Sequence, residues 1–477
     1  MAVVDEKKAV AVIGAGTMGA GIAQVAAAHG HPVYLYDVAA DAAMAAKEQM
    51  SGQLGKRVAR GKMAQSDADS LLERIRPVAD LTALGDAAVV IEAIVENLEI
   101  KRSLFADLEA ILSPDAILAT NTSSISVTSI ANGLNERGRV VGMHFFNPAP
   151  VMKLVEVISG QTTAPEVAET VFKLAQSWGK VAVHARSTPG FIVNRVARPF
   201  YAEALRLYEE QVSDPATLDA LMTQGGGFRM GPFELMDLIG NDVNYAVSES
   251  VFNAFYQDPR FRPSLVQLEL VNAGHLGRKS GRGFYSYGEG EEKPAPLTEA
   301  ISQAAEAFHG FEPGRAITVD GVQFSMTDGR MACDVARRSG SPVVLYDLLD
   351  ADASSSRVGF APSPDVRDES IDRFIKTLAG MGIDAVRLPD WPGLVVMRTV
   401  AMLANEGFEA TMQGVASEAD VDAAMRYGLN YPRGPIKWAR HIGLERILSV
   451  LDALHGLTGD PRYRASLGLR AAASEAS

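Results

Sequence analysis

A glycine-rich turn between an apolar strand and an alanine-rich helix constrains the fold of this chain more than any other feature. The run Val10–Ile13 is uniformly apolar, which is typical of a strand buried on both faces of a parallel sheet. Gly14, Gly16 and Gly19 follow at once with the spacing G-x-G-x-x-G, and a helical pattern continues to His29. In this setting the first glycine permits a tight turn, the second lets a pyrophosphate approach the backbone, and the third lets helix and strand pack closely. The pattern predicts a dinucleotide-binding fold.

A second predicted strand ends in an acidic residue that indicates which dinucleotide is bound. The run Val33–Tyr36 is followed by Asp37, close to the offset of about 20 residues at which a carboxylate accepts from the ribose 2′-OH. Because Asp37 would repel a 2′-phosphate and no Arg follows it directly, the expected cofactor is NAD rather than NADP. A glycine turn in an unrelated α/β protein is the alternative, and the flanking strands and helix weigh against it.

The length and composition are those of an ordinary multidomain globular protein. At 477 residues the chain is too long for one core, and a guide of about 150 residues per domain suggests about three. The net charge of −13 argues against nucleic-acid binding, so an anionic ligand would need a local basic pocket. Cys333 is the only cysteine, which excludes an internal disulfide, and no Cys/His cluster has metal-ligand spacing. Without an apolar N-terminal segment or a stretch of about 18 apolar residues, we expect a soluble, cytoplasmic protein with no membrane partner.

Polar residues stand where further predicted strands end. The runs 88–95 and Ile117–Thr120 are continuous and apolar, with Glu92 the one charged member. The second run stops at the polar stretch Asn121–Ser124. Because ligands of open α/β sheets bind beyond the carboxyl ends of the strands, we expect a reacting group to be met here. Hydroxyl groups also cap helices, and one of Ser123 and Ser124 is expected to serve only as such a cap.

The stretch from Asp41 to Arg76 has a helical pattern and gathers basic side chains in an otherwise acidic protein. These residues are Lys47, Lys56, Arg57, Arg60 and Lys62. They form either a solvated helix face or a binding site for phosphates, and the pattern leaves both interpretations open.

One apolar strand pair carries a histidine and a glutamate at matching positions. The runs 140–146 and 151–158 flank a Pro-containing turn, which predicts that the chain doubles back. If the bend centres near Pro150, His144 and Glu156 are equidistant from it and face each other. A lone His in an apolar strand is more often a core residue, but burying either group alone is costly and their hydrogen bond offsets that cost. The carboxylate would fix the imidazole tautomer and favour its protonated form, so the pair predicts a general base.

An all-helical pattern follows the last predicted strand of this region. The stretch 188–190, Thr-Pro-Gly, is typical of an N-cap followed by Pro at the first helical position, and an amphipathic helix is expected to run to about Gln211. Asn194 lies in its early turns, where an Asn more often supports the helix terminus. Helical segments continue to Leu276, and the stretch 288–296, rich in Gly, Glu and Pro, is predicted to be a linker.

The end of the chain repeats the helical part. The stretch beginning at Pro392 echoes the one beginning at Pro189, 203 residues earlier, and a later Gly-Pro pair recurs at the same offset. Met397 stands in the place of Asn194, so the second copy is predicted to be structural.

The sequence therefore predicts an α/β fold with a Rossmann-type dinucleotide-binding domain followed by all-helical domains. The helical domain is duplicated, and a small reduced α/β domain lies between the copies. This middle part has strand-like runs such as 342–347 but no G-x-G-x-x-G, so it is not expected to hold a dinucleotide in the same way. The expected domain limits are 1–187, 188–288, 297–388 and 389–477.

Six segments, in order, resemble the L-3-hydroxyacyl-CoA dehydrogenase family. They are IGAGTMGAGIA, EAIVENLEIK, NTSS, HFFNPAPVMKLVEVI, TPGFIVNR and GPFELMD, and the resemblance covers about residues 8–287. The second helical domain, over about 390–470, resembles that of longer bacterial members, including those associated with phenylacetate degradation, whose proposed substrate is 3-hydroxyadipyl-CoA. The resemblance implies NAD-dependent oxidation of an L-3-hydroxyacyl-CoA, with 3-hydroxyadipyl-CoA or 3-hydroxybutyryl-CoA as the expected substrate.

The resemblance also implies roles for individual residues. His144 would remove the 3-hydroxyl proton with Glu156 as its electrostatic partner, while Ser123 and Asn194 would hydrogen-bond the reacting oxygen or the thioester carbonyl. The positions expected to contact NAD are Gly14, Gly16, Thr17, Met18, Gly19, Asp37, Glu96, Lys101, Ser123, Asn147 and Lys279. The CoA contacts of the family lie in the helical region after Asp37. There the sequence does not match residue for residue, and the candidates are Arg57, Arg60 and Lys62.

Two other functions fit parts of the pattern: a dehydrogenase of free hydroxy acids or sugar acids on the same scaffold, and a non-catalytic NAD-binding assembly subunit. The basic helix favours CoA, because a free acid carries no 3′-phosphoadenosine. Retention of four residues in the first copy argues against a non-catalytic subunit: Ser123, His144, Glu156 and Asn194. If the helical domains of the family pair between subunits, a chain with two such domains would form the domain–domain contact internally, as a pseudo-dimer. A homodimer of the chain is the alternative.

Overall fold

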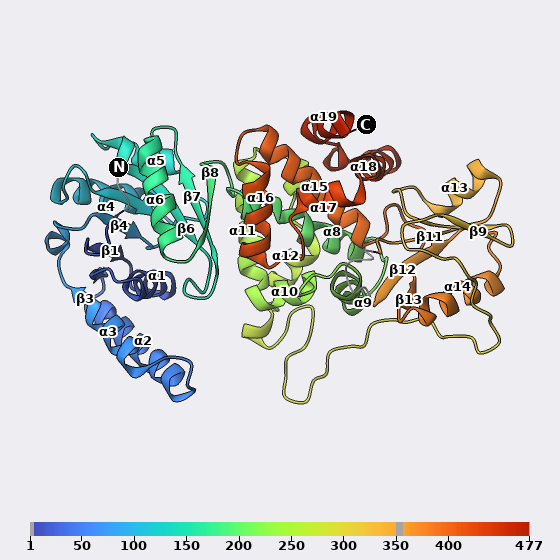
Figure 1. Cartoon of the computed structure of the whole chain (residues 1–477), viewed down its shortest axis with the longest axis horizontal. Helices are drawn as coiled ribbons and strands as arrows, with labels where there is room; N and C mark the ends of the chain where they lie inside the picture. Colours follow the sequence, from blue (N-terminus) through green and yellow to red (C-terminus); the bar gives the residue numbers. More distant parts are fainter. Residues whose placement is uncertain (1–3, 350–355, 477) are drawn as a thin grey trace. The chain divides into compact units, whose positions relative to one another are not determined.

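The computed structural model describes residues 4–349 and 356–476 and falls into two compact units (Figure 1). The first unit comprises 1–193 and 414–429, and the second comprises 194–413 and 430–477. One helix of the second helical copy, α16 (Glu418–Leu429), therefore belongs to the first unit, where it packs on two strands of the sheet.

The first unit is built on an eight-stranded sheet in the order β3-β2-β1-β4-β5-β6-β7-β8. The strands β1 to β6 are parallel, β7 runs antiparallel to β6, and β8 is parallel to β7. The order of the first six strands is that of the doubly wound dinucleotide-binding fold, which confirms the predicted fold class. The strands are β1 (Val10–Ile13), β2 (Val33–Tyr36), β3 (Ile75–Val78), β4 (Val89–Glu92), β5 (Ile117–Thr120), β6 (Val140–Phe145), β7 (Leu154–Ser159) and β8 (Val181–Arg186).

Helices pack on this sheet and bury an apolar core with it. Helix α1 packs on β1 and β2, α6 packs on β7 and β8, and α2 and α3 extend from the sheet as a pair (Figure 1). The helical prediction up to Arg76 is wrong at its end, because Ile75–Val78 forms the edge strand β3. Pro77 cannot continue a helix, whereas an edge strand tolerates it, and Ile75 is fully buried. The helices are α1 (Thr17–Ala28), α2 (Ala42–Ala59), α3 (Gln65–Arg74), α4 (Leu98–Ile111), α5 (Val127–Ala131) and α6 (Pro165–Ser177).

The second unit holds most of both helical copies. The predicted N-cap at Thr188 is wrong, because 188–192 form a turn and the first helix begins at Val193. Pro199, which has no N–H, accompanies a break of the expected long helix into α7 and α8. The first copy contains α7 (Val193–Val196), α8 (Arg198–Glu209), α9 (Pro215–Ala220), α10 (Pro232–Ile239), α11 (Asn241–Ala254) and α12 (Leu265–Asn272). The second contains α15 (Val396–Met412), α17 (Pro435–Ile442), α18 (Leu444–Thr458) and α19 (Leu467–Ala476).

A five-stranded sheet in the order β13-β12-β11-β10-β9 forms the small α/β domain predicted between the copies. Its strand directions from β10 to β13 repeat those from β5 to β8, with one antiparallel step between two parallel ones. Because β12 and β13 begin 203 residues after β7 and β8, the duplication extends beyond the helical part. The elements are β9 (Ile317–Val319), β10 (Val322–Met326), α13 (Ala332–Ser339), β11 (Val343–Tyr346), β12 (Arg357–Pro362), α14 (Asp368–Gly380) and β13 (Asp384–Arg387).

The two helical copies pack on each other inside the second unit through α8 and α15. Arg195 Nε lies 2.6 Å from Glu406 Oε1, and Arg398 Nε lies 2.8 Å from Glu203 Oε2. All four side chains are buried. Each residue of one pair stands 203 positions from its counterpart in the other pair, so the contact is reciprocal, as at a two-fold dimer interface.

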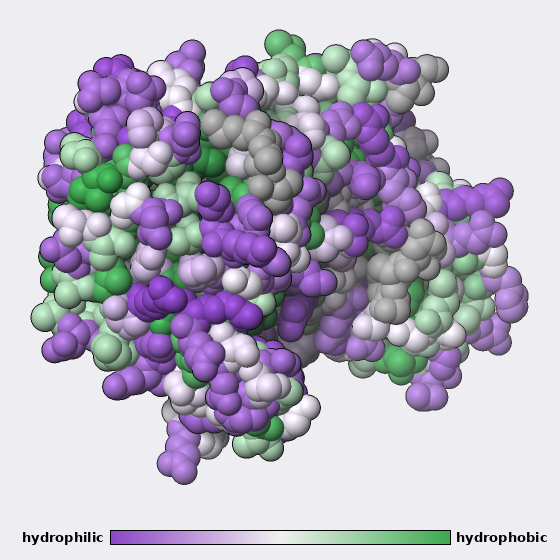
Figure 2. All heavy atoms as spheres, turned by 60° about the vertical axis from the view of Figure 1, so that its left-hand side comes forward, coloured by the Kyte–Doolittle hydropathy of each residue, from purple (hydrophilic) through white to green (hydrophobic). Residues whose placement is uncertain are grey.

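Hydrophilic residues predominate on the face of the molecule shown in Figure 2, with hydrophobic residues interspersed among them. Among the described residues, no helix combines the length and the apolar character that crossing a membrane requires.

Candidate active site

The glycine-rich turn joins β1 to α1, and two of its three glycines leave no room for a side chain. Gly14 has a φ of +100°, and a Cβ there would lie 2.5 Å from the carbonyl oxygen of Ala93. A Cβ on Gly19 would collide with the backbone of Gly14. A Cβ on Gly16 would meet nothing within 4 Å, so open space borders the backbone where α1 begins. This space suits a pyrophosphate beside the free N–H groups of a helix N-terminus.

Asp37 follows β2 and lines a cavity of about 690 Å³ beside the glycine turn. Its Oδ2 accepts from the N–H of Ala15 at 2.7 Å and its Oδ1 from the N–H of Ala39 at 2.9 Å, so the carboxylate is fixed in place. Apolar side chains form much of the cavity wall: Val38, Leu81, Ile94, Val95 and Ile100. An apolar slot with one oriented carboxylate fits the adenosine half of NAD.

A buried ion pair lies at the carboxyl end of β4. Lys101 Nζ lies 2.5 Å from Glu92 Oε1 and 3.3 Å from Glu96 Oε2. The other oxygen of Glu92 accepts from the Thr120 hydroxyl at 2.7 Å, which ties β4 to β5. Lys101 and Glu92 are both buried, so this cation fixes the loop after β4, and its predicted contact with NAD stays a prediction.

Glu96 organises the loop that carries Ser123. One Glu96 oxygen accepts from the Thr122 hydroxyl at 2.6 Å, from the Ser123 N–H at 3.0 Å and from the Ser124 hydroxyl at 2.9 Å. Burial raises the pKa of Glu96, but these hydrogen bonds and the Lys101 ammonium outweigh it and hold the pKa below its ordinary value. Ser124 thus directs its hydroxyl to Glu96, whereas no described residue hydrogen-bonds the hydroxyl of Ser123.

His144 and Glu156 face each other across the antiparallel pair β6–β7, which confirms the predicted juxtaposition. His144 Nδ1 lies 2.7 Å from Glu156 Oε2, and both side chains are buried. The rings of Phe146 and Phe191 lie 4.5 and 5.9 Å from the imidazole centroid. Because the carboxylate holds the proton on Nδ1, the lone pair is on Nε2, for which the described residues supply no partner. This arrangement can take up a proton at Nε2.

Glu156 also holds the start of a helix. Its Oε1 accepts from the N–H groups of Ile192 and Val193, at 3.0 Å each, where α7 begins. This contact replaces the N-cap predicted at Thr188, whose buried hydroxyl has no hydrogen-bond partner. Asn194 follows in α7 as the first residue of the second unit and is half-buried. Its role toward the reacting oxygen stays a prediction.

Asn147 and Arg57 line a second cavity of the first unit, of about 420 Å³, between α1, α2 and the loop joining β6 to β7. Arg60 and Lys62 are exposed and lie just beyond the end of α2. Lys47 donates to a backbone carbonyl of β3 at 2.7 Å, which gives it a structural role. The basic residues therefore differ in their surroundings: Lys47 is held by a backbone carbonyl, whereas Arg57 lines a cavity.

Lys279, expected at an NAD position, lies in the second unit and pairs there with Asp242. The Nζ–Oδ1 distance is 2.6 Å, and the hydrogen bond from Lys279 holds the pKa of Asp242 below its usual value. Both side chains remain partly exposed, and a contact between Lys279 and NAD stays a prediction.

The second half of the chain lacks the histidine–glutamate pair. Asp347 stands 203 residues after His144, and Gly359 stands 203 residues after Glu156. The Asp347 carboxylate accepts, at 2.8 to 2.9 Å, from the N–H groups of Val395, Val396 and Met397. Asp347 thus binds the N–H groups at the start of a helix, as Glu156 does in the first half, but among the described residues no histidine accompanies it.

Sequence reasoning missed two contacts that shape this site. Asn121 Oδ1 accepts from the N–H of Phe145 at 2.8 Å, which fixes the end of β5 to β6 beside His144. The second missed contact is the ion pair between Glu92 and Lys101. A signal for it was present, since a carboxylate alone in an apolar strand needs a buried partner.

Family models match nearly the whole chain. The model "3-hydroxyacyl-CoA dehydrogenase, NAD binding domain" matches residues 9–188, and "3-hydroxyacyl-CoA dehydrogenase, C-terminal domain" matches 190–287 and again 393–475. The model "3-hydroxybutyryl-CoA dehydrogenase reduced Rossmann-fold domain" matches 324–392. The matches agree with the duplicated helical part and the small sheet between its copies.

Relatives and solved structures agree with these matches. The chain is 48% identical over 456 residues to the 3-hydroxyadipyl-CoA dehydrogenase of Escherichia coli, covering 95% of both chains. It is 41% identical over 289 residues to the mitochondrial hydroxyacyl-coenzyme A dehydrogenase of Homo sapiens, covering 59% of this chain and 91% of that one. The crystal structure of a 3-hydroxybutyryl-CoA dehydrogenase from Escherichia coli K12 superposes with a TM-score of 0.94 at 47% identity, covering 98% of both chains.

Proposed function

Because the chain belongs to the 3-hydroxyacyl-CoA dehydrogenase family, we propose that His144 and Glu156 form the base that removes the proton of the substrate's 3-hydroxyl group. The protein is an NAD-dependent enzyme that oxidises 3-hydroxyacyl-CoA to 3-oxoacyl-CoA. The observation that supports the two roles is the 2.7 Å contact between Nδ1 of His144 and the buried carboxylate.

Glu156 keeps the imidazole in one tautomer and stabilises the imidazolium that forms when Nε2 takes the hydroxyl proton. The electrons of the broken O–H bond form the new C=O bond as hydride leaves C3. When bound, NAD⁺ supplies the hydride acceptor. The apolar rings of Phe146 and Phe191 exclude water from one side of the imidazole, which strengthens the interaction of imidazolium and carboxylate.

Ser123 and Asn194 are the proposed hydrogen-bond donors to the oxygen on which charge develops. The Ser123 hydroxyl is available for this, because the surrounding loop is held by Glu96 through other groups. The fixed carboxylate of Asp37 would accept from the adenosine ribose of NAD, and the open backbone at Gly16 would face the pyrophosphate.

For the substrate, we propose a short-chain acyl-CoA, with 3-hydroxyadipyl-CoA and 3-hydroxybutyryl-CoA as the two candidates. The names of the long relative and of the superposed structure support these two acyl groups. Arg57, Arg60 and Lys62 are the proposed partners of the CoA phosphates, and the cavity beside Arg57 supports the first of these assignments. A cytoplasmic location is part of the same proposal.

We further propose that the chain acts as a pseudo-dimer. The reciprocal pairs Arg195–Glu406 and Arg398–Glu203 support this, since each copy supplies the contact that a second subunit would otherwise make. Light scattering of the intact chain should give the mass of one chain, and a stable homodimer would contradict the proposal.

Oxidation of NADH, measured in parallel with acetoacetyl-CoA and with free acetoacetate, tests the reaction in reverse. We expect turnover of the thioester alone, and His144→Ala should lower it by about 10²- to 10⁴-fold with folding retained. Turnover of the free acid as well as the thioester would refute the CoA assignment. Turnover of His144→Ala within threefold of the wild type would remove His144 from the role of base.

A further inference from the structure

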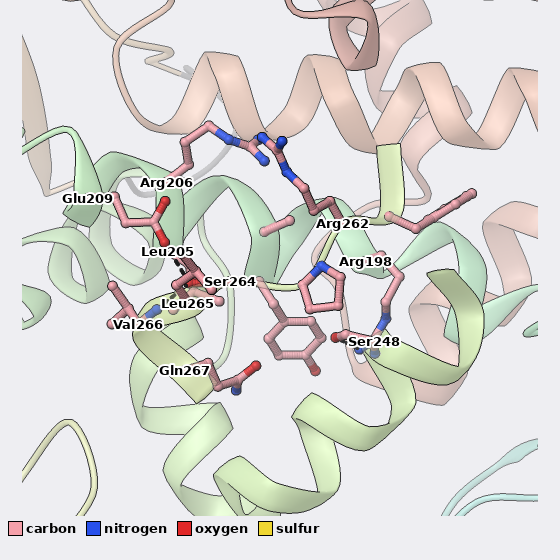
Figure 3. Close-up of a pocket in the computed structure, with 14 residues that line it drawn as sticks. Arg198, Leu205, Arg206, Glu209, Ser248, Arg262, Ser264, Leu265, Val266 and Gln267 are labelled. Carbon is pink, nitrogen blue, oxygen red and sulfur yellow. Dashed lines mark hydrogen bonds between the residues drawn. The ribbon is translucent and has the colours of Figure 1, made fainter. Parts of the chain in front are cut away.

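A cavity of about 610 Å³ in the second unit lies between α8, α11 and the chain entering α12. Its polar lining is rich in arginine (Figure 3). Arg198 and Ser248 lie together on one side, and the side chains of Arg206 and Arg262 extend toward each other on another. Nothing in the reaction scheme above uses this cavity.

Arg198 is an unusual member of this lining, because it is a buried cation without a carboxylate partner. Its side chain is 7% exposed, Nη1 donates to the Ser248 hydroxyl at 3.1 Å, and Nε is buried with no hydrogen-bond partner. The guanidinium carbon lies 4.9 Å from the ring centroid of Tyr201. Burial lowers the pKa of Arg198, opposed in part by the hydroxyls of Tyr201 and Tyr431.

Other deeply buried arginines of this unit have acidic partners. Arg195 pairs with Glu406, and Arg398 pairs with Glu203 and Glu210. Burying a charge costs several kcal/mol unless a partner compensates it. Arg195 and Arg398 each have a carboxylate partner. Among the described residues, no carboxylate pairs with any guanidinium nitrogen of Arg198.

The second helical copy shows that the fold does not need these polar groups. Alanine occupies the position of Arg198, at Ala401, and also that of Tyr201, and a leucine occupies the position of Ser248, each 203 residues further along. Met397 likewise replaces Asn194 in that copy. Arg198, Tyr201 and Ser248 therefore occur only in the helical copy that also carries Asn194, the proposed substrate-binding residue.

We propose that Arg198 binds a carboxylate at the far end of the substrate's acyl group and so selects ω-carboxyacyl-CoA substrates such as 3-hydroxyadipyl-CoA over neutral ones. This inference rests on the proposed function of Asn194 at the reacting oxygen. Asn194 lies in α7 and Arg198 opens α8 four residues later, and because the intervening Ala197 keeps a near-helical backbone, the two residues are about 6 Å apart along the axis. In a hydroxyadipyl group the carboxylate lies three bonds of about 1.5 Å beyond C3, which is within reach of the guanidinium.

A carboxylate suits this position better than the phosphates of CoA. The guanidinium is buried in the wall of the cavity and its Nε has no hydrogen-bond partner among the described residues, whereas a nucleotide end of the substrate needs access to solvent. A planar carboxylate matches the planar donor set of an arginine, and the uncompensated charge is neutralised only when such a substrate is bound. The acyl chain of 3-hydroxybutyryl-CoA ends in a methyl group one bond beyond C3, so it would leave the charge uncompensated.

The test compares kcat/KM for 3-hydroxyadipyl-CoA and 3-hydroxybutyryl-CoA in the wild type, Arg198→Met and Arg198→Lys. The wild type should prefer the adipyl substrate, and Arg198→Met should lower the ratio of the two kcat/KM values by about 10- to 100-fold, chiefly through KM of the adipyl substrate. Arg198→Lys should recover part of the ratio, because it keeps the charge. The melting temperature of Arg198→Met should not fall, because a charge without a carboxylate partner is removed.

Binding of adipyl-CoA and butyryl-CoA, which lack the reacting hydroxyl, gives a readout independent of turnover. Wild-type protein should bind adipyl-CoA at least tenfold more tightly, and Arg198→Met should lose that difference. Arg262→Met, which removes an exposed cation from the same cavity, is the matched control and should keep the wild-type ratio. An equal loss on both substrates in Arg198→Met, or a changed ratio only in Arg262→Met, would overturn the assignment. Failure of the wild type to oxidise either thioester would instead overturn the proposed function.

Discussion

The substitution Glu156→Gln separates the catalytic role proposed for this carboxylate from its structural role. Gln has nearly the same shape, so its side-chain oxygen can still accept from the N–H groups of Ile192 and Val193, which Glu156 binds at 3.0 Å. Its amide nitrogen would then face Nδ1 of His144, which lies 2.7 Å from the carboxylate in the wild type. Because an amide nitrogen only donates, Nδ1 must become the acceptor, and the imidazole proton moves to Nε2.

This change of tautomer removes the lone pair that we assign to the general base. Loss of a positioned base lowers turnover by about 10²- to 10⁴-fold, and an imidazole held in the wrong tautomer belongs near the upper end of that range. The free energy of unfolding should change less, by about 1–2 kcal/mol, because the two backbone hydrogen bonds persist with a neutral acceptor. The variant should therefore fold and bind NAD but turn over about 10³- to 10⁴-fold more slowly.

The assay is NADH oxidation with saturating acetoacetyl-CoA, combined with thermal unfolding of each variant. Asp347→Asn is the matched control, because Asp347 accepts from N–H groups at the start of α15 and its described hydrogen-bond partners include no histidine. It should lose at least as much stability, because both Asp347 oxygens accept from N–H groups and the amide nitrogen of Asn cannot, whereas kcat should be unchanged. Turnover of Glu156→Gln within threefold of the wild type would refute the reasoning. An equal loss of turnover in Asp347→Asn would assign the effect to folding.

Three further substitutions test other parts of the structure. Because the fold lowers the pKa of Glu96, its ionised form stabilises the protein above about pH 4.5 and that contribution is lost as the pH falls. The deficit in melting temperature of Glu96→Gln should therefore be full at pH 7 and should shrink as the pH falls below about 4.5 and through the lowered pKa, and a deficit that stays the same down to the onset of acid unfolding would contradict this. Arg398→Met leaves Glu203 buried with one cation fewer and should lower the free energy of unfolding in urea by about 3 kcal/mol, with a loss below 1 kcal/mol as the contrary result. Gly19→Ala forces a methyl group onto the glycine turn and should weaken NAD binding, measured by calorimetry, by about 1–3 kcal/mol, whereas wild-type affinity would show that the turn can adjust.

Much of the fold could be predicted because its signals are local. Continuous apolar runs mark strands buried on both faces, and the glycine spacing fixes the first strand–turn–helix unit. The repeat of 203 residues is visible in the sequence because Pro-Gly and Gly-Pro pairs recur in register. The errors at Ile75–Val78 and Thr188 arose where a distant element decides the local structure. The segment Ile75–Val78 pairs with β2 at the edge of the sheet, and Glu156 caps the helix start where Thr188 was expected to do so. The four domain limits stay predictions.

The candidate site could be predicted where two residues lie at matching distances from a turn, as His144 and Glu156 do. It could not be predicted where the partner is remote in sequence or is engaged by a second group. The ion pair of Lys101 with Glu92 is one example, and the hydrogen bonds from Glu96 to the loop that carries Ser123 are another, because they depend on strands that meet only in the folded sheet. Such contacts follow from strand order, which periodicity alone does not give.

The duplicated halves show what folding requires of the site and what it does not. Each half places a carboxylate against the N–H groups that open a helix, Glu156 at α7 and Asp347 at α15. In the second half this carboxylate occupies the position of His144 and reaches the helix directly, so the helix start is satisfied without an imidazole. A buried histidine is therefore no requirement of the cap, and its presence in the first half needs a chemical reason. The same comparison applies to Arg198, because the second half folds with Ala401 in its place and a cation buried without a carboxylate opposes folding.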